Sequence, residues 1–377
     1  MARPGMRALP RAANDPRRAG GFSLIELMIA LVIGAVLTGI ILRMTAGTLA
    51  TYRSDEYLAR LQENARYAIE RIDFSARMAG FGGCSRVIRN QLNTASTDYR
   101  PALYDPTPVL SGWEFTGTGA GSSYAITTLD PSGVAVSQWS GPAGANLVSD
   151  LKDLVVPGTD VLVVKRADQL LGLGATGTTA ANVTTINLSG ANGINQNALV
   201  LIADCQGGDL FQNQSADNAA TLARTTGGSP GNLSQNLSHQ YDQSMEIYTY
   251  AVEVYYVGRG ISGEPSLFRR SYYASGTGTI QNLEIAEGVE NMQILYGEDL
   301  DGDLQADDYR TASAVANWDN VMAMRVALLL RTVETGRQEN DTATYSLLGT
   351  TITPAAADAR RHRRVFATTI SLRNKVG

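Results

Sequence analysis

The chain has 377 residues and a formal net charge of −5, a length that accommodates a membrane helix together with one large or two small globular units. Residues 1–21 carry five arginines against one aspartate, or +4, so the rest of the chain has a charge of about −9. Such an acidic balance argues against a general nucleic-acid surface. The 38 glycines are typical of an exported domain built from strands and loops.

The first predicted element is an apolar helix over residues 22–42. These 21 residues would form a helix of about 31 Å, which matches the hydrocarbon core of a bilayer. No charge lies between Leu27 and Leu42, and arginines precede the segment. Positive charge on this side predicts that the N-terminal end stays cytoplasmic while the rest of the chain is exported.

The sequence Gly21-Phe22-Ser23-Leu24-Ile25-Glu26 resembles the prepilin peptidase site of type IV pilins and type II secretion pseudopilins. The resemblance implies that residues 1–21 are a leader, which the peptidase removes by cutting after Gly21. It also implies that Phe22 becomes the N-methylated first residue and that Glu26 is the carboxylate at mature position five. Because the cut precedes the apolar segment, the helix would stay in the mature protein.

Glu26 is the single carboxylate in this apolar surrounding. Placing a charged side chain in a membrane costs about 2.5 to 3.5 kcal/mol on insertion scales, so a partner is expected. The terminal amine created at Phe22 of a neighbouring subunit would serve, and this ion pair would set the register of packed helices. The alternative is a carboxylate that reaches the cytoplasmic interface and pairs with nothing.

An amphipathic pattern continues the helix over residues 43–80. Apolar residues recur at steps of three and four, with charged residues between them. Gly80, Gly82 and Gly83 then supply a stop. We therefore expect one helix from Phe22 to Ala79, whose second half packs on a soluble domain with one face and meets solvent or neighbouring subunits with the other.

Two cysteines, Cys84 and Cys205, follow in the exported part of the chain. In an oxidising compartment two thiols predict one disulfide. Its loop of about 120 residues would contribute on the order of 4 to 5 kcal/mol in the chain-entropy model. The alternative is a pair of separately buried free thiols.

Four segments narrow the resemblance to PilW-type minor pilins, in which the long helix ends at a glycine-rich turn with a cysteine. They are Gln62–Ala68, Arg77–Cys84, Trp318–Val326 and Arg363–Asn374. The family resemblance implies an α+β, type IV pilin-like fold with a long N-terminal helix on a mainly antiparallel β-sheet. The implied partners are the prepilin peptidase, other minor pilins, the major pilin, the inner-membrane assembly platform and a tip adhesin.

Residues 81–377 are expected to form this β-rich domain, periplasmic before assembly and extracellular afterwards. The best strand candidates are short, β-branched or aromatic, and often alternating. They are 160–165, 183–188, 198–203, 246–257, 266–273, 289–296, 321–331 and 365–373. Residues 90–150 and 206–243 are rich in Gly, Ser, Asn and Thr, so we interpret them as surface insertions.

No segment predicts catalysis. Residues 172–177 fit the glycine pattern of a dinucleotide loop, but no helix is expected after them, which removes the physical basis for phosphate binding. The two histidines, His239 and His362, fall in a polar loop and in an arginine-rich run, outside any zinc or catalytic pattern. We therefore expect a protein that is not an enzyme.

An acidic segment, residues 298–308, is the candidate metal site. Carboxylates at alternate positions around Gly302 can converge on a hard cation such as calcium. The candidate ligands are Asp299, Asp301, Asp303, Asp307 and Asp308. The glycine does not fall at the EF-hand position, so the alternatives are a calcium loop of nonstandard spacing and a solvated acidic turn.

A basic run, residues 360–364, precedes the last predicted strand. The favoured interpretation is an exposed loop that pairs with the acidic remainder of the chain or with a partner pilin. Contact with nucleic acid or a membrane surface is the alternative.

Together these features predict a minor pilin that is processed by prepilin peptidase, waits in the inner membrane and primes type IV pilus assembly at the tip, supporting motility or adhesion. The closest alternative is a tip pseudopilin of type II secretion. A tip adhesin or DNA-uptake component is a further alternative, supported by the loop insertions and the arginine run.

Overall fold

The computed structural model describes residues 21, 23–85, 87–170, 173–274, 276–337 and 339–374. The chain divides into two compact units, Met1–Arg53 and Ser54–Gly377. Of the predicted leader, Gly21 lies within the described residues and the rest lies outside them. The predicted first mature residue, Phe22, is also outside the described residues.

One long helix, α1 (Leu24–Arg77), belongs to both units. Its ends agree within two residues with the predicted Phe22–Ala79. Gly80 adopts a φ of +74° and donates its N–H to the carbonyl of Lys165 at 2.9 Å, which ends the helix. The two compact units divide after Arg53, whereas the end of the apolar run predicted the membrane boundary at Leu42. The two positions differ because the helix loses its apolar character before it begins to pack on the β-domain.

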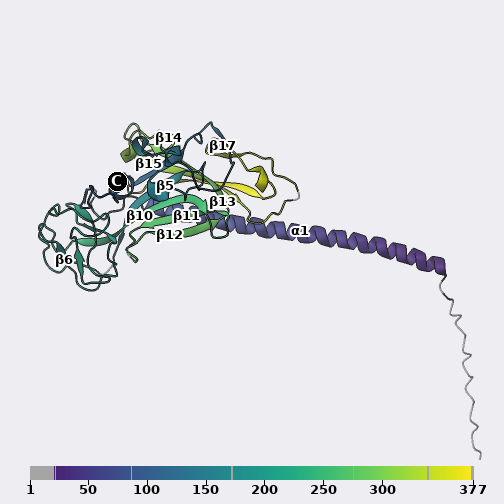
Figure 1. Ribbon diagram of the computed structural model, residues 1–377, viewed down its shortest axis with the longest axis horizontal. Coiled ribbons are helices and arrows are strands. Elements are labelled where there is room, and N and C mark those ends of the chain that lie inside the picture. The colour runs from purple at the N-terminus through teal and green to yellow at the C-terminus, as the bar shows by residue number, and fades with distance from the viewer. Residues whose placement is uncertain are drawn as a thin grey trace, which may run out of the picture. The chain divides into compact units, whose positions relative to one another are not determined.

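A nine-stranded sheet makes up much of the second unit. Its order is β1-β8-β7-β10-β5-β2-β4, with β11 joined to β10 and β12 joined to β11, so that β10, β11 and β12 lie side by side (Figure 1). The strands are β1 (Ile88–Asn90), β2 (Leu110–Phe115), β4 (Trp139–Ser140), β5 (Val161–Gln169), β7 (Leu199–Ala203), β8 (Gly208–Gln212), β10 (Glu246–Arg259), β11 (Pro265–Tyr272) and β12 (Gln281–Glu287).

A second sheet has four strands in the order β14-β13-β15-β18. They are β13 (Val289–Glu298), β14 (Asp308–Arg310), β15 (Val321–Arg331) and β18 (Arg363–Ser371). Two small sheets contain β3 (Ser123–Ala125), β16 (Tyr345–Leu347) and β17 (Thr350–Thr353), and β6 (Thr185–Asn187) with β9 (Thr221–Ala223). Only β1·β8 and β17·β3 are parallel pairs among the described strands, so the predicted antiparallel arrangement is confirmed.

Short helical turns occupy the connections. They are α2 (Pro101–Tyr104), η1 (Val136–Gln138), η2 (Pro142–Gly144), η3 (Ser149–Leu151), η4 (Trp318–Asn320) and η5 (Ala356–Asp358). Each has only three or four residues, so they serve as connections and add little to the core.

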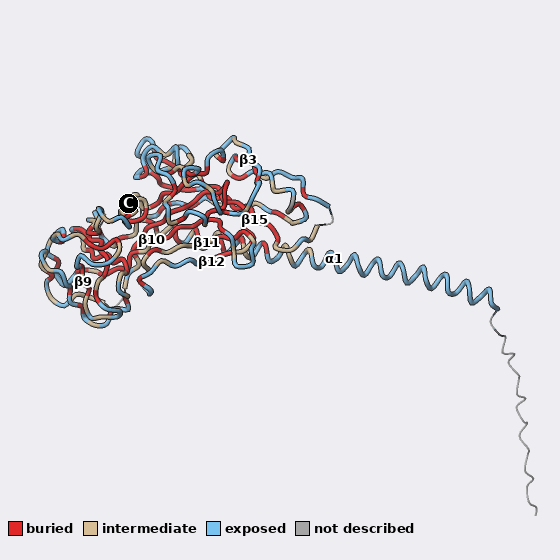
Figure 2. Tube along the Cα trace, viewed as in Figure 1, coloured by how far each residue is buried: buried red, intermediate tan, exposed pale blue. Residues whose placement is uncertain are grey.

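The largest core cluster joins the second half of α1 to both main sheets. Leu61 and Ile72 of α1 are buried against residues that include Leu162 of β5, Met292 of β13 and Leu328 of β15. Figure 2 shows this interior as buried strands. Burying a side chain of this size contributes about 1.5 to 3 kcal/mol relative to exposure, so this contact anchors the helix on the β-domain.

The prediction that residues 90–150 and 206–243 are surface insertions is wrong in part. The first contains β2, all of whose residues are buried, and the second contains β8, which is likewise buried throughout. Phe115 of β2 packs edge-to-face on Trp139, with ring centroids 4.9 Å apart. The glycine- and serine-rich surroundings concealed these short strands, whose few large side chains complete the main sheet.

Candidate functional site

The start of α1 is closed by a reciprocal pair of hydrogen bonds between Ser23 and Glu26. The Ser23 N–H donates to Glu26 Oε2 at 2.9 Å, and the Glu26 N–H donates to Ser23 Oγ at 3.2 Å. This arrangement is a capping box, which satisfies two backbone donors that the first helical turn leaves free. The spacing Ser-x-x-Glu is visible in the sequence, and our sequence reasoning did not use it.

The first unit exposes an apolar helical surface. Every residue of α1 from Leu24 to Arg53 is exposed, including Leu24 at 77% and Leu31 at 66% (Figure 2). Soluble proteins rarely leave a continuous apolar surface of this kind uncovered. The segment therefore needs a surrounding other than water.

Backbone and hydroxyl groups in this segment are satisfied within the helix itself. Thr38 donates to the Gly34 carbonyl at 2.7 Å, and Thr45 donates to the Ile41 carbonyl at 2.9 Å. Internal pairing of this kind is what a hydrocarbon environment requires. Among the described residues, α1 is the one helix with a segment long and apolar enough to cross a membrane.

The second half of α1 carries a buried polar cluster, which the sequence reasoning missed. Arg166 of β5 donates to Glu253 of β10 at 2.7 Å and to Ser75 Oγ of α1 at 2.9 Å. Tyr255 also donates to Ser75 Oγ, at 3.0 Å. Burial raises the pKa of Glu253, but the Arg166 guanidinium outweighs this effect and holds the pKa below its ordinary value. The cluster fixes the helix to the sheet with a charged pair in addition to apolar packing.

The predicted disulfide between Cys84 and Cys205 is confirmed. The two Cα atoms are 4.9 Å apart, and 121 positions separate the residues in the chain. Cys84 follows the end of α1, and Cys205 lies in the turn between β7 and β8. The bond therefore ties the end of the long helix to the main sheet.

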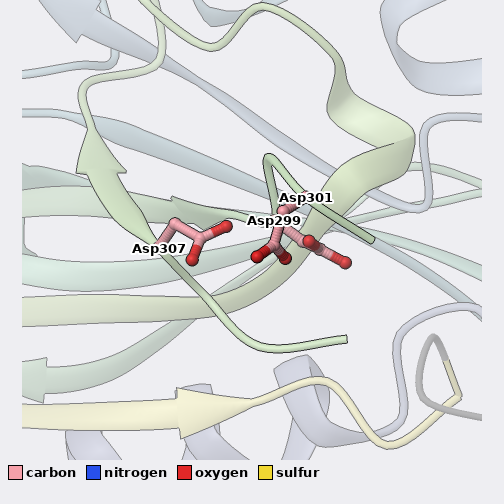
Figure 3. A group of neighbouring side chains, drawn as sticks. All are labelled: Asp299, Asp301 and Asp307. Atoms are coloured by element: carbon pink, nitrogen blue, oxygen red, sulfur yellow. The ribbon is translucent and has the colours of Figure 1, made fainter. Parts of the chain in front are cut away.

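The acidic loop between β13 and β14 brings three of its five candidate ligands together. Carboxylate oxygens of Asp299, Asp301 and Asp307 all lie within 4.8 Å of one another. Figure 3 shows Asp299 and Asp301 near each other and Asp307 on the returning arm of the loop, before β14. Three oxygens at this separation can face one hard cation.

The other two candidates make different contacts. Asp303 accepts from the N–H of Gln305 at 2.8 Å, and Asp308 pairs with Arg310 at 2.9 Å. Asp299 accepts from the N–H groups of Gly302 and Leu304, a pattern that also stabilises a turn without an ion. Calcium binding thus stays a prediction, with Asp299, Asp301 and Asp307 as its core.

The basic run is divided between the interior and the surface. Arg363 is buried and pairs with the buried Glu290 at 2.6 Å, while Arg361 pairs with Glu264 at 2.9 Å. Arg360 and Arg364 are exposed. The predicted pairing with acidic residues is confirmed for two arginines, but the interpretation as an exposed loop is wrong for Arg363, which begins β18. Because two of the arginines are already paired with carboxylates, the interpretation of the run as a nucleic-acid surface is weakened.

The two histidines make local polar contacts, and a strand follows the dinucleotide-like glycine pattern. His239 pairs with Asp204 at 2.9 Å, and His362 lies 3.2 Å from Ser54 Oγ. Gly172, the first glycine of the dinucleotide-like pattern, lies outside the described residues. In the described part of that segment, the next regular element is strand β6, so the absence of a following helix agrees with the prediction.

A cavity of about 400 Å³ lies beside the end of α1 in the second unit. Gly80, Lys165, Tyr250 and Asn374 are among its lining residues. Burial lowers the pKa of Lys165 to about 7, and its ammonium group donates to the Asp105 carbonyl at 2.7 Å. Sequence reasoning could not find this site because Lys165 lies in an otherwise ordinary strand pattern.

Two segments of the chain match known protein families. Residues 254–374 match the family model described as Type IV Pilus-assembly protein W. Residues 16–42 match the prokaryotic N-terminal methylation motif. No curated protein and no solved structure matches the chain. The matches agree with the resemblance to PilW-type pilins drawn from the sequence.

Proposed function

We propose that this protein is a minor pilin of the type IV pilus, a non-enzymatic subunit that primes assembly and is placed at the pilus tip. The observation that carries the proposal is the presence of both family matches on one helix-and-sheet scaffold. The methylation motif begins the long helix, and the PilW match runs from within β10 past the end of β18. A structural subunit of this kind acts through helix packing and partner contacts.

Processing is the first step of the proposed mechanism. Prepilin peptidase would cut after Gly21, which is exposed and precedes the first turn of α1. The apolar residues of α1 would then hold the subunit in the inner membrane, with residues 54–377 in the periplasm. After release from the membrane, the same apolar surface would pack against the helices of other minor pilins and the major pilin.

Glu26 would act twice in this sequence. Before assembly, its carboxylate accepts from the Ser23 N–H and closes the helix start. During assembly, the charged Phe22 amine of a neighbouring subunit would be a stronger donor than a neutral backbone N–H. Exchange of one partner for the other would set the axial register without leaving a buried charge unpaired.

Deletion of the gene in its native cell tests the proposal. Surface pili are counted by electron microscopy, and type II secretion is assayed in the same strain. Loss of pili with normal secretion is the expected result. Normal pili with failed secretion would overturn it in favour of a type II secretion pseudopilin, and survival of both activities would favour accessory adhesion or DNA uptake.

Complementation with Glu26 variants tests the register step separately. Glu26→Leu removes both the helix cap and the ion pair, whereas Glu26→Gln keeps a hydrogen-bonding cap and removes the charge. We expect both variants to be cleaved after Gly21 and both to restore few pili. Full restoration by Glu26→Gln would show that the charge is dispensable.

We also propose calcium as the ligand of the acidic loop, coordinated by Asp299, Asp301 and Asp307. The proximity of their oxygens supports this proposal. Calorimetric titration of the full chain in detergent with calcium should give heat that is absent in an Asp301→Asn, Asp307→Asn variant. Absence of heat in both proteins would identify the loop as a solvated acidic turn.

A further inference from the structure

Strand β18 forms one edge of the four-stranded sheet. It pairs with β15 over nine residues, from Arg363 to Ser371, and no other described strand pairs with it. A strand in this position presents a row of unpaired backbone N–H and C=O groups on its outer side.

The hydrogen bonds at both ends of the ladder show which residues present these groups. The Leu372 N–H donates to the Met322 carbonyl, and the Thr332 N–H donates to the His362 carbonyl, both at 2.9 Å. Even-numbered residues of the strand therefore turn their backbone groups toward β15. The outward groups belong to Val365, Ala367, Thr369 and Ser371, and no hydrogen bond within the described part of the chain reaches them.

The side chains at these outward-pairing positions are mostly exposed. Ala367, Thr369 and Ser371 are exposed, whereas Val365 packs partly against the core that includes Leu329. The open edge thus begins next to a small apolar cluster and continues over small, polar side chains. An incoming strand would meet no bulky obstruction from these residues.

The edge also lacks the charges that usually protect such strands. From Val365 to Leu372 there is no charged residue and no proline. The edge strand β12, by contrast, carries Glu284 and Glu287. Charges and prolines on edge strands prevent pairing with other chains, so β12 is protected and β18 is not.

Charges at the two ends of β18 indicate the kind of partner. Arg364 and Arg373 are both exposed and flank the uncharged stretch. If two copies paired antiparallel with Ala367 opposite Thr369, Arg373 would face Arg363 of the second copy, whose charge Glu290 already compensates. In a parallel pair with equal register, Arg364 would lie beside Arg364 of the second copy. The parallel pair is therefore destabilised by like charges, and in neither arrangement does β18 of a second copy offer a carboxylate to Arg364 or Arg373. A segment that carries acidic residues would complement both arginines.

We propose that the free edge of β18 binds an extended, uncharged segment of a different protein, with acidic residues at both ends of that segment. The segment would add a fifth strand to the sheet through backbone hydrogen bonds. Its flanking carboxylates would meet Arg364 and Arg373 and fix its register. The inference rests on the sheet edge alone and does not require the proposed role in pilus assembly.

A synthetic peptide tests this proposal on the full chain in detergent. The probe has eight alternating threonine and valine residues with two aspartates at each end, and its binding is followed by fluorescence anisotropy. We expect it to bind and to slow amide hydrogen exchange at Ala367 and Thr369. A matched peptide with lysines in place of the aspartates should bind at least tenfold more weakly, because its charges repel the flanking arginines.

Variants of the edge show whether the backbone groups are responsible. Thr369→Pro removes one outward N–H and keeps the ladder with β15, so binding should weaken roughly tenfold, as expected for one lost hydrogen bond. If this variant unfolds at a lower temperature than the wild type, Ala367→Pro, which removes another outward N–H, replaces it. This variant should weaken binding by a similar factor.

Several results would overturn the proposal. They are failure of the aspartate-flanked peptide to bind, equal binding to a folded Thr369→Pro or Ala367→Pro variant, and slowed exchange confined to strands other than β18. Dimerisation of the chain through β18 would replace the proposed partner by a second copy.

Discussion

The two halves of α1 have the same backbone conformation and opposite surroundings. From Leu24 to Arg53 all side chains are exposed, although most of those before Arg43 are apolar. From Ser54 to Arg77 the helix buries Leu61, Ile72 and several alanines against the sheets and adds a buried charged cluster at Ser75. The first half therefore needs a surrounding other than water, whereas the second half is stabilised by its own chain.

This difference shows how one helix can connect two environments. A long helix needs tertiary packing for most of its stability, and only the second half obtains it within the subunit. Changes in the second half should affect folding of the β-domain. Changes in the first half should affect membrane insertion or assembly and leave that folding unaltered.

The largest effect is expected from loss of the disulfide that ties the second half of α1 to the main sheet. A Cys84→Ser, Cys205→Ser variant should lose up to about 4 to 5 kcal/mol of unfolding free energy, because a loop of 121 positions is no longer closed in the unfolded chain. Urea unfolding of the full chain in detergent measures the loss. An unchanged midpoint would contradict this account.

The buried charged cluster should give the next largest effect. Glu253→Leu removes the buried carboxylate partner of Arg166 and leaves only the half-exposed Asp168 beside the guanidinium, which should cost about 3 to 5 kcal/mol. Urea unfolding again provides the measurement, with the exposed Glu63→Leu as the control. Adding Arg166→Met to Glu253→Leu should recover much of the loss, and failure to do so would indicate that the charge pair is not its cause.

A charge in the first half should act on a different property. Val32→Asp places a carboxylate in the exposed apolar segment and should disfavour membrane insertion by about 2.5 to 3.5 kcal/mol. The measurement is the fraction of the chain recovered with membranes, compared with Val32→Leu. Unfolding of residues 54–377 should be the same in both variants. A less stable β-domain in Val32→Asp would contradict the independence of the two halves of α1.

Lys165 should make the stability of the β-domain depend on pH. Its folded-state pKa of about 7 lies below the ordinary value of 10.5. Between pH 7 and pH 10.5 the lysine is therefore protonated in the unfolded chain and neutral in the folded one. Unfolding free energy should therefore rise with pH above 7, by at most about 1.4 kcal/mol per unit, and the contribution should be fully unfavourable below pH 7. Lys165→Met should flatten this slope, whereas the exposed Lys152→Met should retain it.

The smallest effect concerns the start of the first half. Ser23→Ala removes one arm of the capping box and should weaken the first helical turn by about 1 kcal/mol. Hydrogen exchange at the Glu26 and Leu27 amides measures the change. Ser23→Asp, which can also cap a helix, should restore protection, and equal exchange in all three proteins would argue that the cap is not formed.

Much of this division could be predicted from the sequence. The apolar run from Phe22 to Leu42, the later amphipathic pattern and Gly80 gave the helix and its end within two residues. The strand over 321–331 was predicted with its observed bounds, because apolar residues fill it on both sides of Arg325. Two thiols in an exported chain sufficed for the disulfide.

Long-range contacts account for what could not be predicted. β2 and β8 lie in glycine- and serine-rich surroundings, and they become recognisable as strands only through their neighbours in the sheet. The pairing of Arg166 with Glu253 joins positions 87 residues apart, and no local pattern indicates it. Of the acidic loop, the sequence supplied five candidates, and the fold selected the three whose oxygens converge.

The two halves of α1 should occupy different environments, and cysteine labelling tests this most directly. Single cysteines at Leu31, Val36, Glu63 and Glu70 can be treated with a membrane-impermeant maleimide in opened membranes, where the native disulfide does not react. Cysteines at Leu31 and Val36 should stay unlabelled until detergent is added, while those at Glu63 and Glu70 should label at once. Equal labelling of all four positions without detergent would contradict the claim.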